Sequence, residues 1–123
     1  MAEEALGPTG TPVPPDVEAE IITLGNLSLN LGNYRVTVDG LPVEVTYYEF
    51  ELLRLLAAQH DRVVPYHSLS LSLWRGAGRS AIRHLNVITH RLRTKLAGSR
   101  PYVIETVRGR GYGLLTSRKV QRG

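Results

Sequence analysis

Arginine side chains, which can bind phosphate groups and the edges of DNA bases, are concentrated in the C-terminal part of this chain. Residues 75–123 contain twelve of the fifteen basic side chains and a single acid, Glu105, whereas residues 1–40 contain six acids and only Arg35. The formal net charge of +4 for the whole chain conceals this contrast. Such an asymmetry indicates a nucleic acid or an anionic membrane surface as the partner, and a solvated basic face is the alternative.

The first basic segment, residues 79–96, has the spacing of an amphipathic helix. At about 100° per residue, one narrow stripe that should pack on the protein contains Ile82, Leu85, Thr89, Leu92 and Leu96. The opposite face presents Arg83, Val87, His90, Arg91 and Thr94. Val87 could contact a thymine methyl group in a major groove, or it could be an ordinary surface valine. Arg93 and Lys95 border the apolar stripe, which favours contact with phosphate over contact with bases.

The second basic segment, residues 102–115, has the pattern of two short strands around a glycine-rich turn. Gly109 and Gly111 would allow a tight turn that exposes Arg108 and Arg110 at its tip. The segment lacks the strand-to-helix context and the Lys-Ser/Thr of a phosphate-binding loop, so nucleotide binding is not expected. A basic helix beside an arginine-tipped hairpin suits a polyanion with a groove, and the sequence therefore predicts a surface for duplex DNA.

The elements that must position these segments come earlier in the chain. From residue 22 to residue 45, apolar side chains alternate with period two. The alternation is interrupted by residue pairs that favour turns: Gly25-Asn26, Gly32-Asn33 and Asp39-Gly40. This pattern predicts a four-stranded antiparallel sheet. Its last strand should lie at an edge, because Pro42 cannot donate a hydrogen bond to a neighbouring strand.

Two helices are expected between this sheet and the basic helix. Thr46 and Glu49 have the spacing of a capping box, so a buried helix should begin after Thr46. A second, shorter helix is expected over residues 65–73, with Pro65 at its first helical position. Gly98 and Pro101 should end the third, basic helix.

Composition divides the chain into one domain and two tails. Residues 7–16 contain four prolines and two glycines, which is typical of an extended or flexible linker. We therefore expect a flexible tail over residues 1–20, a folded domain over residues 21–116 and a basic tail over residues 117–123. The N-terminus is acidic where a secretory signal is basic, and no apolar run approaches about 18 residues. The expected location is therefore the cytoplasm, with no membrane partner.

The sequence offers no constellation of residues for catalysis. The chain has no cysteine, which excludes disulfides and thiolate metal sites. The histidines at positions 60, 67, 84 and 90 lack the spacing of a His-Glu-x-x-His site, and no serine lies in a nucleophile elbow. We therefore expect neither an enzyme nor a bound metal or cofactor.

Specific motifs accompany these patterns along residues 22–115. The most specific are Arg91-Leu92-Arg93 with Lys95-Leu96, and Thr106-Val107-Arg108-Gly109 with Gly111-Tyr112. The others are Asp39-Gly40, Val45-Thr46, Glu49-Phe50, Leu52-Leu53, Val63-Val64, Trp74, Arg83 and Val87. On these motifs the chain resembles the OmpR/PhoB-type winged-helix effector domain of two-component response regulators. The resemblance implies an α+β fold, namely a winged helix-turn-helix with an N-terminal four-stranded antiparallel sheet, three helices and a C-terminal β-hairpin wing.

The resemblance also implies sequence-specific binding of double-stranded DNA and regulation of transcription within a phosphorelay. Residues 79–96 would be the recognition helix in the major groove, and residues 106–112 would be the wing in the minor groove. We predict DNA-binding residues from two sources: positions that match the family's motifs, and the outward face of the helix. They are Trp74, Arg79, Arg83, Val87, His90, Arg91, Arg93, Thr94, Thr106, Arg108 and Arg110.

The partners implied by the resemblance are direct-repeat DNA half-sites, a second copy bound head to tail, and RNA polymerase through residues 75–82. This loop lacks the acids of well-known activators, so activation and repression both stay open. Asn86 stands where the family usually has an aspartate. No stretch supplies the acidic pocket of a phosphoacceptor domain, which would need about 120 further residues. A winged helix that only docks with another protein is the alternative function.

Overall fold

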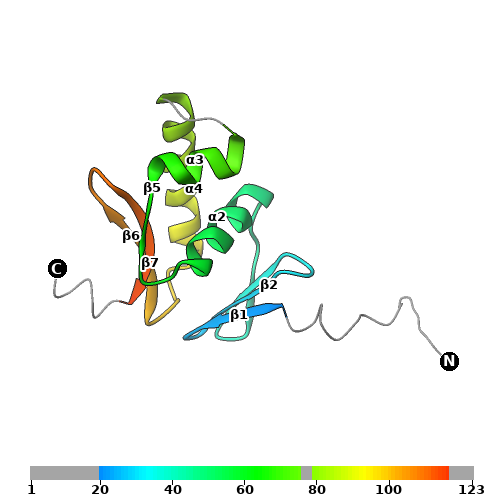
Figure 1. The fold of residues 1–123 in the computed structure, drawn as a ribbon. Coiled ribbons are helices and arrows are strands. Elements are labelled where there is room, and N and C mark those ends of the chain that lie inside the picture. Colours follow the sequence, from blue (N-terminus) through cyan, green and yellow to red (C-terminus); the bar gives the residue numbers. More distant parts are fainter. Residues whose placement is uncertain (1–19, 76–78, 117–123) are drawn as a thin grey trace.

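The computed structural model describes residues 20–75 and 79–116, which contain three helices and two antiparallel β-sheets (Figure 1). The predicted α+β organisation is therefore confirmed. The two predicted tails lie outside the described residues, except for Glu20. Within the described residues, no helix has both the length and the apolar character that a membrane span requires.

The N-terminal sheet contains four short strands in sequential order. They are β1 (Ile21–Leu24), β2 (Leu27–Asn30), β3 (Arg35–Val38) and β4 (Leu41–Val43). Gly25 and Gly40 lie in turns at the predicted positions with φ angles of 64° and 78°, a region that disfavours any side chain. The strand that contains Pro42 is at an edge, as predicted. Leu27 and Leu29 alternate along β2 and are completely buried, so one face of the sheet belongs to the core.

The helices are α2 (Tyr47–Ala58), α3 (Tyr66–Trp74) and α4 (Arg79–Lys95). The predicted capping box begins α2. The Thr46 hydroxyl accepts a hydrogen bond from the Glu49 amide at 3.2 Å, and the Glu49 carboxylate accepts one from the Thr46 amide at 2.9 Å. Figure 1 shows α2 between the N-terminal sheet and the other two helices. Each of the three helices contacts the other two, so they form one packed layer.

The C-terminal sheet has one strand more than the predicted hairpin. β6 (Tyr102–Val107) and β7 (Gly111–Thr116) form the hairpin, and β5 (Val63–Pro65) pairs with the free side of β7. The sequence prediction missed β5 because three residues are too few to show a period, and because their partner is distant in the chain. Pro65, predicted as the first helical residue of α3, is instead the last residue of β5.

The third strand also explains one of the two glycines of the hairpin. Gly109 has a φ angle of 79° and allows the turn, as predicted. A Cβ atom on Gly111, however, would lie only 1.9 Å from the carbonyl oxygen of Val64. The prediction that Gly111 serves the turn is therefore wrong, since this glycine lets β5 approach β7.

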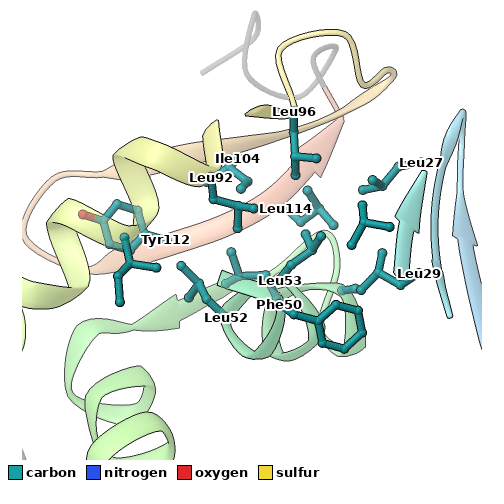
Figure 2. Packing of buried hydrophobic residues seen from close by; sticks show 14 of the residues in the cluster. Leu27, Leu29, Phe50, Leu52, Leu53, Leu92, Leu96, Ile104, Tyr112 and Leu114 are labelled. Atoms are coloured by element: carbon teal, nitrogen blue, oxygen red, sulfur yellow. The ribbon is translucent and has the colours of Figure 1, made fainter. Parts of the chain in front are cut away.

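One hydrophobic core joins these elements (Figure 2). Side chains from β2, α2, α4 and the hairpin meet in it, among them Leu27, Leu29, Phe50, Leu53, Leu92, Ile104 and Leu114. Each of these side chains is at most 4% exposed. Burial of this kind is the main favourable contribution to folding, and here it fixes α4 against both the body and the hairpin.

Candidate nucleic-acid interface

α4 turns its predicted polar face outward. The exposed side chains of this face are Arg83, Val87, His90, Arg91 and Thr94. Val87 retains 43% of its accessible surface, although it is apolar. Arg79, the first residue of the helix, is also exposed. The helix therefore presents a largely basic surface with one apolar residue near its centre.

The buried side of α4 differs slightly from the predicted stripe. Leu85, Thr89 and Leu92 are buried as predicted, and Ile88 is a further buried residue with 6% exposure. Ile88 lies three residues after Leu85 and four before Leu92, a helical spacing that could have revealed it. Ile82, which was predicted in the stripe, is only partly buried in the first turns of the helix.

Arg93 joins α4 to the hairpin. Its Nε donates a hydrogen bond to the carbonyl oxygen of Ile104 at 3.2 Å, and its Nη2 donates one to Oγ1 of Thr106 at 2.7 Å. Two residues predicted to bind DNA, Arg93 and Thr106, thus contact each other in the folded chain. Because these bonds connect the last turn of α4 with the end of β6, they fix the position of the hairpin relative to the helix.

A second contact joins the other strand of the hairpin to α4. The Tyr112 hydroxyl donates a hydrogen bond to Oδ1 of Asn86. Tyr112 is 5% exposed, and its ring packs edge to face on Tyr66 with 5.3 Å between the centroids. Burial raises the pKa of the Tyr112 hydroxyl, so at neutral pH the group keeps the proton that it donates. Sequence reasoning did not include Asn86 or Tyr112 in the site.

The tip of the hairpin exposes two arginines. The Arg110 amide donates a hydrogen bond to the Val107 carbonyl at 2.9 Å and closes the turn. The Arg110 carbonyl in turn accepts a hydrogen bond at 3.1 Å from the amide of Tyr66, the first residue of α3. Arg108 and Arg110 are both exposed at this anchored turn. Figure 1 shows the tip extending beyond the body of the protein on the α4 side.

Trp74 lies at the end of α3, where aromatic rings hold it on two sides. The imidazole of His84 is nearly parallel to the indole, at 11° with 5.0 Å between the centroids. The ring of Tyr48 lies 5.5 Å from the indole on a tilted plane. Trp74 is partly buried, whereas Tyr48 and His84 are exposed. No local pattern could reveal this group, because its rings come from three different helices.

Lys95 does not extend freely from the end of α4. Its Nζ lies 2.6 Å from Oε1 of Glu49, whose side chain is 2% exposed. Burial by itself would raise the pKa of the Glu49 carboxyl. The hydrogen bonds from Lys95 and from the Thr46 amide, with the charges of Lys95 and Arg91, outweigh burial and lower that pKa. The pair therefore ties α4 to the capped start of α2.

The remaining basic groups of this surface have no such partners. Within residues 20–75 and 79–116, no hydrogen bond or ion pair involves the guanidinium groups of Arg79, Arg83, Arg91, Arg108 and Arg110. The hydroxyl of Thr94 donates to the His90 carbonyl at 3.1 Å. Two neighbouring elements, α4 and the hairpin tip, thus expose five arginines whose donors are available to an anionic ligand.

A hollow elsewhere on the described part of the chain lies apart from these arginines. It has a volume of about 800 Å³, lies between β3, β4 and the start of α2, and shares only Lys95 with α4. In the part of the chain that the structure describes, no cluster of three His, Cys, Asp or Glu side chains could hold a metal ion. The candidate interface is therefore the exposed face of α4, the hairpin tip and Trp74.

The sequence matches one protein family over most of the domain. The family model for "Transcriptional regulatory protein, C terminal" matches residues 40–114. The response regulator PmrA of Pseudomonas aeruginosa is 37% identical over 90 residues, which cover 73% of this chain and 39% of PmrA. The chain thus spans about two-fifths of the length of the curated relatives that it matches.

Solved structures share the fold. The DNA-binding domain of CpxR from E. coli has a TM-score of 0.68 at 30% identity, over 78% of this chain and 96% of that domain. The DNA-binding domain of RstA from Klebsiella pneumoniae, solved in complex with the RstA box, has a TM-score of 0.67 at 30% identity. That match covers 78% of this chain and 97% of the RstA domain. The predicted winged-helix fold is therefore confirmed.

Proposed function

We propose a function from one premise: the chain belongs to the family of C-terminal, OmpR/PhoB-type effector domains of transcriptional regulatory proteins. In our proposal it binds double-stranded DNA in a sequence-specific manner and regulates transcription as the effector domain of a two-component response regulator. α4 enters the major groove, and the turn between β6 and β7 reaches the adjacent minor groove. One observation carries this proposal: the unpartnered arginines of α4 and of the hairpin tip lie on elements that Arg93 joins.

The proposed residues divide into two roles. Base readout is assigned to the centre of the exposed face of α4, namely Arg83, Val87, His90 and Arg91. Phosphate or sugar contact is assigned to the periphery, namely Trp74, Arg79, Thr94, Thr106, Arg108 and Arg110. Arg93 uses two of its three nitrogens within the protein, and the third is proposed to donate to a phosphate. Its larger role is to position the hairpin.

Binding to DNA should depend strongly on salt. Arginine and lysine side chains that contact phosphates displace the counterions condensed on the DNA, and added salt opposes this release. The affinity of the purified chain for duplex DNA should be measured over a series of salt concentrations. We expect a slope of log affinity against log salt of roughly −4 to −7, which corresponds to about 5–8 neutralised phosphates. A slope near zero, together with no selection of a preferred sequence, would favour the alternative function, a winged helix that docks only with another protein.

The partners implied by the resemblance belong to the same proposal. We infer two copies bound head to tail on direct-repeat half-sites, and RNA polymerase as a further partner through residues 75–82. PmrA is a response regulator, and control by a phosphorelay is proposed here on that likeness. We propose no catalytic activity, and the cytoplasm as the compartment. Titration of duplexes with one and with two half-sites tests the paired arrangement by its stoichiometry.

A further inference from the structure

Asn86 lies on the exposed side of α4, among residues assigned to base readout. It directly precedes Val87, follows Arg83 by three positions and precedes His90 by four, so these four side chains share one region of the helix surface. Like its neighbours, Asn86 is exposed. It differs from them in one respect: a side chain from the hairpin fixes the orientation of its amide group.

Tyr112 provides that fixed orientation. Its hydroxyl donates to Oδ1 of Asn86, and its buried ring, packed on Tyr66, cannot follow a rotation of the amide. The raised pKa of the hydroxyl keeps the group protonated. A phenol hydroxyl can donate or accept, and in the structure the acceptor oxygen of the Asn86 amide is turned toward it, so Tyr112 donates.

The geometry of the amide group determines which hydrogen-bonding groups of Asn86 remain available to a ligand. A side-chain amide is planar and carries its acceptor oxygen and its donor nitrogen on different sides. With Oδ1 turned toward Tyr112, Nδ2 is turned away from the hairpin. Among the described residues, its N–H groups have no hydrogen-bond partner. The surface beside Val87 thus carries an oriented, solvent-accessible donor.

We propose that Asn86 is a specificity-determining residue that donates from Nδ2 to an acceptor in the major groove. This proposal rests on the proposed function. The acceptors there are O6 and N7 of guanine, O4 of thymine and N7 of adenine, whereas the exocyclic amino groups of adenine and cytosine are donors. A free asparagine can pair with N6 and N7 of adenine together. Tyr112 engages Oδ1 and fixes the plane of the amide, so we expect Asn86 to act through Nδ2 alone. A lone donor should prefer guanine or thymine, because in adenine the N6 amino group, itself a donor, lies beside the N7 acceptor.

Selection of duplexes from a random pool tests the proposal through the consensus rather than through affinity alone. Asn86→Asp replaces the donor with an acceptor. It should change the preferred base at one position from guanine or thymine to cytosine or adenine, and it should weaken binding to the wild-type consensus about 3- to 30-fold. Tyr112→Phe removes only the hydroxyl and frees the amide to rotate. It should broaden the same position to include adenine and leave the others unchanged.

A matched control separates this readout from a simple effect of charge. Asn33→Asp makes the same substitution at an exposed position of the turn between β2 and β3, and it should keep the wild-type consensus. If Asn86→Asp enriches the same base as the wild type at every position, the proposal for Asn86 is overturned and the proposed function stands. If the wild-type protein itself enriches no sequence, the proposed function fails, and the inference fails with it.

Discussion

The N-terminal sheet and the surface of α4 both expose polar side chains, but the two regions differ in how many of these side chains have partners within the protein. In the sheet, the side chain of Asn26 donates to the Asp39 carboxylate and to the Gly98 carbonyl, both at 3.0 Å, and it accepts from the Arg100 amide at 2.7 Å. The turn between β1 and β2 is thereby joined to the segment that connects α4 with β6. In this region the exposed polar groups help to hold the fold.

On α4 and at the hairpin tip the exposed cations are left unsatisfied. The guanidinium groups of Arg83, Arg91, Arg108 and Arg110 form no ion pair within the described residues. The basic residues that do have partners, Arg93 and Lys95, lie at the border of the exposed face. α4 therefore carries two kinds of basic residue: those that position other elements, and those whose donors are available to a ligand.

We expect the greatest loss of stability from a change in the backbone packing of the C-terminal sheet. Gly111→Ala should lower the free energy of unfolding by about 3 kcal/mol or more, because the new methyl group would meet the backbone of Val64, which cannot yield like a flexible side chain. Urea-induced unfolding measures this loss. It would show that the hairpin depends on its close approach to β5.

Gly98→Ala is the matched control. A Cβ atom there would contact only Val38, at an ordinary distance of 3.8 Å, so stability should change by less than about 0.5 kcal/mol. Equal stability of the Gly111→Ala variant and the wild-type protein would contradict the packing of β7 against β5.

Removal of one arginine from each region should distinguish the two regions by their contribution to DNA affinity. Arg91→Ala should lower the affinity for the preferred duplex by roughly 5- to 150-fold, since a good arginine–base pair contributes about 1–3 kcal/mol of discrimination. Arg35→Ala removes the same charge from an exposed position of β3 and should lower the affinity less than about twofold. Fluorescence anisotropy at one fixed salt concentration measures both. Similar losses for the two variants would mean that net charge, rather than the α4 surface, determines binding.

The parts of this molecule that the sequence predicted correctly depend on local patterns. The capping box at Thr46, the turns at Gly25 and Gly40, and the two faces of α4 follow from residues that are close in the chain. Local spacing contains this information because backbone geometry fixes which neighbours share a face. The winged-helix fold was predicted from motifs of the same local kind.

The features that the sequence did not predict depend on contacts between distant residues. β5 is a strand only because β7 lies beside it, and the indole of Trp74 is held by rings from α2 and α4. Arg93 has the same place on the helical wheel whether it contacts a phosphate or the Ile104 carbonyl. Periodicity can place a side chain at the border of a face, but it cannot identify the partner that tertiary structure brings there.

Loss of the ion pair that ties α4 to α2 should have only a weak effect. Glu49→Gln should lower stability at neutral pH by only about 1 kcal/mol, because the Lys95 side chain is 35% exposed and solvent screens its charge. The effect on pH dependence is more informative. The pKa of the Glu49 carboxyl is lowered by its hydrogen bonds and by nearby positive charges, against the opposing effect of burial.

The sign of the pH dependence follows from this lowered pKa. Above the ordinary pKa of glutamate, the carboxyl is ionised in both the folded and the unfolded chain, and the stabilisation is complete. As the pH falls through that value toward the lower pKa of the folded state, the unfolded chain takes up the proton first and stability is lost. Urea unfolding between about pH 6 and pH 3 should therefore show a steeper loss for the wild-type protein than for Glu49→Gln. Lys95→Met removes the hydrogen-bond donor and should also flatten the dependence. Parallel curves for all three proteins would mean that the Glu49–Lys95 pair does not stabilise the contact between α4 and α2.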